Sequence, residues 1–245
     1  ILGKKIIDES KLAGIDMKDC LILEGEPTST YLSILDENGD MILSISHMDL
    51  FDRMKVDFIK DKSHIIENAL ALVVDTNIPR DVIEYLVTTY RDKKFFLDTV
   101  STTKAKKVKD LIGYFHTIKP NRIEAEILSG IRIETEDDLN KASEYFLKKG
   151  VKRVFISLGS EGVYYDDGET KGLMKGPDIK VVNATGAGDA FMAALVYAYL
   201  NDINIEESAR MGIAASIIAI SHENTISPNM SIKNIELLMK EVKNI

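Results

Sequence analysis

The chain has 245 residues, of which 45% are hydrophobic and 29% are charged, and its formal net charge is −8. This composition excludes intrinsic disorder, and the acidic balance without a sustained run of Lys or Arg argues against nucleic acid as the main partner. No apolar stretch approaches the roughly 20 residues that cross a bilayer, and the single cysteine, Cys20, cannot form an internal disulfide, so we expect a cytoplasmic protein that binds no membrane.

The first fifty residues predict a helix that ends at Gly14, a short strand at 20–23 and a β-hairpin. The hairpin strands, 30–35 and 41–46, flank a segment that contains Asn38-Gly39. Asn-Gly between two β-rich runs is a strong hairpin signal.

From residue 56 onward, short apolar strands alternate with helical segments. The predicted strands are 70–74, 95–97, 115–118, 153–157 and 163–165, and the predicted helices are 79–90, 103–112, 122–129, 136–148, 187–200, 206–220 and 232–242. Such alternation implies βαβ units and a mostly parallel sheet with helices on both faces. We therefore expect a single α/β domain over residues 1–245, from which the hairpin protrudes.

The most informative segment runs from an apolar strand through two glycines into a long apolar helix. Gly186 and Gly188 allow a ligand to approach the backbone closely, and the first N–H groups of the helix form an anion site suited to phosphate. Asp189, in the first turn of that helix, could accept a proton from an attacking hydroxyl. The segment suggests phosphoryl transfer to an alcohol, although a plain glycine turn with a helix-stabilising Asp fits the local sequence equally well.

Two further junctions between a strand and the next segment are candidate ligand-binding sites. Asn121 and Glu124 have the spacing of a capping box. This spacing fits two roles, that of simply beginning a helix and that of aiming polar groups into the crevice at the strand ends. Residues 157–162 form a glycine-bearing turn after a buried strand, and a plain β-turn explains this turn when it is taken alone.

Together, these three segments resemble the ribokinase-like (PfkB) family of carbohydrate and nucleoside kinases. Residues 183–191 are similar to the family's signature Asp-x-Thr-Gly-Ala-Gly-Asp-x-Phe, 121–124 to its Asn-x-x-Glu motif and 157–163 to its nucleotide loop. The resemblance implies a three-layer α/β/α sandwich with a mostly parallel central sheet and a small β-hairpin lid at about 28–47. It also implies acceptor-binding strands before a segment like 1–16, so the kinase domain would be N-terminally incomplete.

The resemblance assigns roles to particular residues of an ATP- and Mg²⁺-dependent kinase. Asp189 would be the catalytic base, and Glu124 would hold Mg²⁺ through a water molecule. The backbone groups expected to form the anion hole belong to Gly186, Ala187 and Gly188. The residues expected at the nucleotide are Asn121, Ser157, Gly159, Gly162 and Asn224.

Several stretches, among them 27–32, 74–77 and 116–126, most resemble the branch of the family that phosphorylates the 5′-hydroxyl of pseudouridine to give pseudouridine 5′-phosphate. The alternatives are a kinase for another sugar or nucleoside, such as ribose, adenosine or a ketohexose, and a non-catalytic binding protein with the same fold. Thr30 and Ser46 of the lid would contact the acceptor.

Two further expectations concern a cation and a partner. Asn183 stands where most relatives have Asp, so K⁺ binding beside Asn183 and Thr185 is left open. The lid hairpin is expected to join two copies into a homodimer. One face for that contact would consist of Tyr31, Ser33, Leu35 and Ile42.

Overall fold

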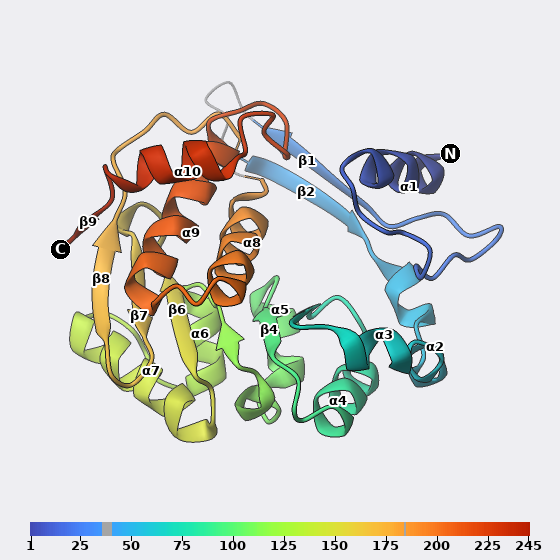
Figure 1. The fold of residues 1–245 in the computed structure, drawn as a ribbon, viewed down its shortest axis with the longest axis horizontal. Helices are drawn as coiled ribbons and strands as arrows, with labels where there is room; N and C mark the ends of the chain where they lie inside the picture. The colour runs from blue at the N-terminus through green and yellow to red at the C-terminus, as the bar shows by residue number, and fades with distance from the viewer. Residues whose placement is uncertain (36–40, 184) are drawn as a thin grey trace.

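The computed structural model describes residues 1–35, 41–183 and 185–245, and the expected turn at Asn38-Gly39 lies outside them. Within these residues the chain forms a seven-stranded sheet with helices on both faces and a separate two-stranded hairpin (Figure 1). No helix in this described part is long and apolar enough to cross a membrane.

The central sheet has the strand order β3-β4-β5-β6-β7-β8-β9. Strands β3 to β6 run parallel, whereas the ladders from β6 to β9 are antiparallel, so five of the seven described strands share one direction. The strands are β3 (Leu72–Asp75), β4 (Phe95–Asp98), β5 (Thr117–Ile118), β6 (Arg153–Ser157), β7 (Val163–Asp166), β8 (Lys171–Lys175) and β9 (Lys243–Asn244). The predicted, mostly parallel sheet is confirmed, while the polar strands β8 and β9 have no apolar run that would reveal them in the sequence.

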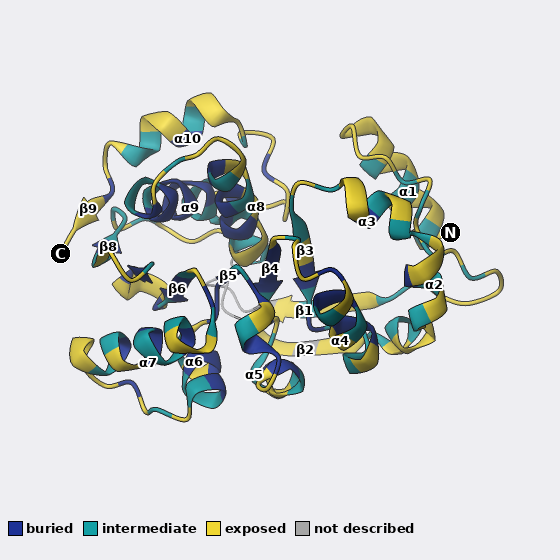
Figure 2. Ribbon diagram, turned by 60° about the horizontal axis from the view of Figure 1, so that its bottom comes forward, coloured by how far each residue is buried: buried dark blue, intermediate teal, exposed yellow. Residues whose placement is uncertain are grey.

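Alternating side chains of the strands decide which face each helical layer covers. In β4, Phe95 and Leu97 belong to one core and Phe96 to the other. The first core packs under α4 (Arg80–Thr89), α5 (Thr102–Ala105), α6 (Arg122–Ser129) and α7 (Glu136–Lys149). The second packs under α8 (Ala187–Leu200) and α9 (Ile205–Ile220), and α10 (Ile232–Met239) lies on α9 (Figure 2). The expected three-layer sandwich is confirmed.

The hairpin and α1 (Leu2–Leu12) extend from one end of this sandwich (Figure 1). Strands β1 (Thr30–Leu35) and β2 (Met41–His47) pair antiparallel, which confirms the predicted hairpin. They lead through the 3₁₀ helix η1 (Asp49–Arg53) into α2 (Val56–Asp61) and α3 (Ser63–Asn68), two short helices that the sequence did not predict.

The hairpin has two different faces. Tyr31 lies opposite Ser46, and both line a cavity against the sandwich. The other face is apolar and exposed and consists of Leu32, Ile34, Leu43 and Ile45. Of the face expected to make an intermolecular contact, Tyr31 borders the protein's own cavity, whereas Ile42 is exposed. The side chain of Leu35 lies outside the described set, and the homodimer stays a prediction.

Two local predictions are wrong. Residues 20–23 form no strand, and they belong to neither of the two described sheets. The helix predicted at 103–112 ends at Ala105 and continues as the 3₁₀ helices η2 (Lys106–Val108) and η3 (Ile112–Tyr114). Arg80 donates a hydrogen bond to the backbone carbonyl of Lys107, so a long-range contact takes an acceptor that an uninterrupted helix would use internally.

Candidate active site

Polar side chains gather where the parallel strands end. Asp75 ends β3, Asp98 ends β4, Lys119 follows β5 and Ser157 ends β6. Because parallel strands end at the same edge of a sheet, residues far apart in the sequence meet there, and this edge is where open α/β sheets bind ligands. The first turn of α8 faces the same edge.

The start of α8 is built as an anion site. Gly186 occupies the N-cap position with φ +90°, and no side chain caps the helix. A Cβ on Gly186 would lie 2.6 Å from the carbonyl oxygen of Thr225, so both the conformation and the space require glycine. The first N–H groups of a helix lack acceptors within it and lie at the positive end of its dipole, so an anion is favoured here.

The loop before this turn is tied to the loop after α9. The amide oxygen of Asn183 accepts a hydrogen bond from the backbone N–H of Thr185 at 2.9 Å, and its amide nitrogen donates to the carbonyl of Glu223 at 2.9 Å. The backbone N–H of Val182 also donates to the carbonyl of Ile220, at 2.8 Å. These bonds hold the backbone that positions Gly186.

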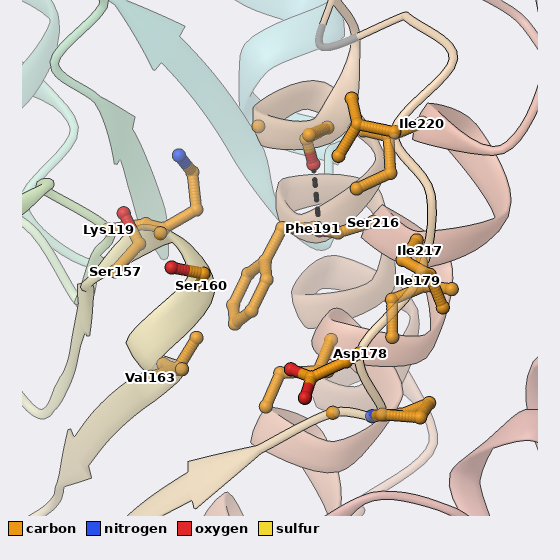
Figure 3. Close-up of a pocket in the computed structure, with 18 residues that line it drawn as sticks. Lys119, Ser157, Ser160, Val163, Asp178, Ile179, Phe191, Ser216, Ile217 and Ile220 are labelled. Atoms are coloured by element: carbon orange, nitrogen blue, oxygen red, sulfur yellow. Dashed lines mark hydrogen bonds between the residues drawn. The ribbon is translucent and has the colours of Figure 1, made fainter.

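A first cavity, of about 400 Å³, lies between the sheet edge and helices α8 and α9 (Figure 3). Lys119, Ser157 and Ser160 lie on the sheet side of the view, and the isoleucines of α9 lie opposite. We call this space the apolar cavity. Its apolar wall includes Val163, Ile179, Phe191, Ile213, Ile217 and Ile220. Such a wall suits a flat ring, while the glycine turn at 159–162 and the start of α8 offer backbone groups to an attached anion.

A second cavity, of about 1010 Å³, lies between the same sheet edge and the hairpin. We call it the polar cavity. Its polar side chains include Asp75, Asn77, Asp98, Ser101, Lys104, Asn121, Glu124 and Asp189, and Tyr31 and Ser46 border it from the hairpin. Hydroxyl-rich molecules are bound by such a set of carboxylates, amides and amines.

Lys119 and Gly188 line both cavities. The two spaces therefore meet at the start of α8, where the anion site lies. Two molecules bound on either side of this junction would face each other across it, which is the arrangement needed to pass an anionic group from one to the other.

Asp189 lies on the polar-cavity side of this junction. Its carboxylate is open to the cavity, yet the surrounding protein desolvates it enough to raise its pKa, and the nearby charge of Asp98 raises this pKa further. Lys119 opposes both effects. A carboxylate with a raised pKa is a better proton acceptor than an ordinary one, as a general base requires.

Glu124 lies below the same cavity within a fixed network. Its Oε2 accepts hydrogen bonds from the Thr99 hydroxyl at 2.6 Å and from the backbone N–H of Asn121 at 2.9 Å. The Asn121 side chain in turn accepts from the backbone N–H of Glu124 at 2.9 Å, so the capping box is present. Glu124 Oε1 has no hydrogen-bond partner among the described residues.

This arrangement fits an indirectly held Mg²⁺. No group of three or more His, Cys, Asp or Glu residues that could cage a metal ion occurs in the described ranges. Mg²⁺ in phosphoryl-transfer sites usually keeps several waters and takes few protein ligands, so one free carboxylate oxygen at the cavity wall is a suitable partner.

The structure brings most of the predicted site residues to the two cavities. Ala187, Gly188, Ser157, Gly159 and Gly162 line the apolar cavity. Asp189, Gly188, Asn121, Glu124 and Ser46 line the polar cavity, so Asn121 lies on a different side from the one predicted.

The remaining predicted residues lie elsewhere. Thr30 borders a third cavity beside α1, and Asn224 is exposed in the loop after α9 and lines neither of the two cavities that meet at α8. Asn183 and Thr185 bond to each other behind the glycine turn. The position of Thr30 follows from the pleat, because it points to the opposite side of β1 from Tyr31.

The sequence reasoning missed Asp75, Asp98 and Lys119. Asp75 and Asp98 end short strands and Lys119 directly follows one, and that position was the available signal. It also missed the isoleucines of α9, since apolar residues that line a cavity have the same pattern as apolar residues of a core.

Comparison with known proteins agrees with this geometry. Residues 2–232 match the pfkB family carbohydrate kinases, and the chain belongs to this family. It is 34% identical to the pseudouridine kinase of Escherichia coli (strain K12) over 242 residues, which cover 98% of this chain and 77% of that protein.

Solved structures show the same fold. A proposed sugar kinase from Clostridium perfringens is 46% identical, with a TM-score of 0.87 over 99% of this chain and 77% of that one. Ribokinase from Thermotoga maritima, at 23% identity, has a TM-score of 0.79 over 97% of this chain and 77% of that one. The fold is thus ribokinase-like, and the family identifies a phosphotransferase that acts on an alcohol group of a sugar or nucleoside with ATP as co-substrate.

Proposed function

We propose that the protein transfers the γ-phosphoryl group of ATP to the 5′-hydroxyl of pseudouridine. The observation that carries the transfer is the junction of the apolar and polar cavities at the start of α8, with Asp189 on the polar side. Similarity to the E. coli pseudouridine kinase over 98% of the chain supports the choice of acceptor.

In this proposal ATP occupies the apolar cavity. The adenine ring packs against Ile179, Ile213 and Ile217, and the phosphates extend past the 159–162 turn toward the first N–H groups of α8. Backbone groups of Gly186, Ala187 and Gly188 stabilise the charge on the transferring phosphoryl. Bound Mg²⁺ would neutralise phosphate charge, and Glu124 would hold one of its waters.

The acceptor occupies the polar cavity with its hydroxyl beside Asp189. Asp189 takes the proton of that hydroxyl as the new O–P bond forms and the bond to the ADP leaving group breaks. The hairpin residues Tyr31 and Ser46 close this cavity from the side away from the sheet, which would limit access of water to the phosphoryl group.

An acceptor panel with a coupled ADP assay tests the proposal. Pseudouridine should give the highest kcat/KM, and ribose, uridine, adenosine and fructose should be poor substrates. Preference for one of these others would reject pseudouridine while retaining the chemistry. Asp189→Asn should lower kcat by about 10³-fold while ATP binding, measured by calorimetry, is retained; near-normal turnover would remove Asp189 from the role of base.

We further propose that two copies associate through the hairpin face that consists of Leu32, Ile34, Leu43 and Ile45. These side chains lie on both strands of one exposed face, and a two-fold contact would pair this face with itself. Sedimentation should give a dimer that Ile34→Glu with Ile45→Glu converts to a monomer. A wild-type monomer at micromolar concentration would contradict this assembly.

A further inference from the structure

Lys119 is a buried lysine at the point where the two cavities meet. Only 8% of the residue is exposed. Its backbone is fixed on both sides, because its N–H donates to the Leu97 carbonyl and the following Pro120 carbonyl accepts from Ser157 at 3.0 Å. The side chain leaves this rigid strand end and borders both cavities.

The ammonium group of Lys119 is only loosely held. Its ion-pair partner is Asp98, with Nζ 3.5 Å from Oδ2, and the two side chains are 10% and 18% exposed. Nζ makes no hydrogen bond to any other described residue. A buried ammonium usually satisfies its three N–H donors, so this group has bonding capacity to spare on the side of the cavities.

The same ammonium faces the anion site. A Cβ on Gly188 would lie 3.4 Å from Lys119 Nζ, so Nζ is in contact range of the first turn of α8. Two sources of positive potential, the helix N-terminus and the lysine, therefore converge on one point between the cavities. In the transfer step the phosphoryl group carries negative charge through this point, and a fixed cation is worth most where water is excluded.

We propose that Lys119 is a catalytic residue that binds the phosphoryl group during its passage from ATP to the acceptor, with Asp98 holding the ammonium in place when no phosphoryl is bound. The inference rests on the proposed function. The lysine gains and loses no proton: the γ-phosphoryl leaves ADP, bonds to the acceptor oxygen, and the hydroxyl proton goes to Asp189.

Lys119→Met tests the charge, because methionine keeps much of the length of the side chain. We expect kcat to fall at least about 100-fold, as for the loss of one group that stabilises the transition state, and KM for the acceptor to change less than threefold. ATP, which carries the γ-phosphoryl, should bind about tenfold more weakly by calorimetry, and ADP should bind as before. Lys94→Met is the matched control, since Lys94 is exposed just before β4, at the opposite end of the sheet.

A pH profile separates this role from a structural one. Lys119 lowers the pKa of Asp189, so its removal should move the acid limb of kcat/KM to higher pH. If Lys119→Met turns over within fivefold of wild type, or loses ADP and ATP affinity equally, the inference is overturned. If this variant does not fold, Lys119→Arg decides: turnover within tenfold of wild type supports the inference, and a greater loss overturns it.

The proposed function can fail separately. A wild-type protein that phosphorylates no acceptor in the panel rejects the function itself. An active wild type whose rate is indifferent to Lys119 rejects only this inference.

Discussion

Two glycines of one turn should respond in opposite ways to the same substitution. Gly186 has a left-handed backbone, and a Cβ there would lie 2.6 Å from the Thr225 carbonyl oxygen, whereas a Cβ on Gly188 would touch only the end of the Lys119 side chain at 3.4 Å. A flexible ammonium can move aside, but a backbone carbonyl held within a bonded loop cannot move as freely. The two positions are therefore a matched pair.

The cost at Gly186 can be estimated from these distances. The left-handed conformation costs an alanine about 1–2 kcal/mol, and the Thr225 oxygen must move by roughly 0.8 Å to reach ordinary contact. We expect Gly186→Ala to destabilise the fold by about 2–3 kcal/mol, or a fall in Tm of about 5–10 °C at this chain length. A displacement of the backbone by roughly 0.8 Å at the anion site should also lower kcat by about 10²-fold.

Gly188→Ala should instead stabilise the protein, because alanine is the better helix former by up to about 1 kcal/mol. Its methyl group would nevertheless stand at the junction of the two cavities, so kcat should fall by about 10-fold or more. Differential scanning calorimetry and the coupled ADP assay measure both effects. Shifts of Tm in the same direction for the two variants, or an unchanged Tm for Gly186→Ala, would refute the reasoning.

Three further predictions concern His116, Thr99 and Asn183. Burial lowers the pKa of His116 to about 4, so its contribution to stability is complete above about pH 6.5 and declines as pH falls toward 4. Allowing for partial access of water, the loss of unfolding free energy at pH 5 should be about 1–2 kcal/mol. Urea unfolding at several pH values measures it, and His116→Gln should flatten the curve of stability against pH between about pH 6.5 and 4. Parallel curves for the wild type and the variant would argue against a buried neutral His116. Thr99→Val removes the hydroxyl that donates to Glu124 and should cost about 1–3 kcal/mol of unfolding free energy. Thr99→Ser keeps the hydroxyl and should cost clearly less. Equal losses for the two variants would contradict this account. Asn183→Asp replaces an amide donor to the Glu223 carbonyl by a carboxylate, so the activity of the variant should depend more on K⁺ than that of the wild type. The assay exchanges K⁺ for tetramethylammonium. An equal response of the variant and the wild type to K⁺ would exclude a cation beside residue 183.

Local signals in the sequence were enough to determine several features. The sequence predicted the capping box at Asn121 and Glu124, the glycine turn before α8 and the hairpin. Each of these depends on residues only a few positions apart in the chain. The alternation of short apolar strands and helices determined the α/β class for the same reason. The signature around Asp189 pointed to the family that the comparison then confirmed.

Contacts between distant segments were decided only by the tertiary structure. Three such features depend on which strands are neighbours and on how helices pack on them. They are the ion pair of Lys119 and Asp98, the meeting of the two cavities at Gly188 and the end of α5 at Ala105. The hairpin pattern likewise did not reveal which of its faces turns toward the sandwich. A strand pattern records which side chains share a face, but the direction of that face depends on what it packs against, and that is a property of the whole fold.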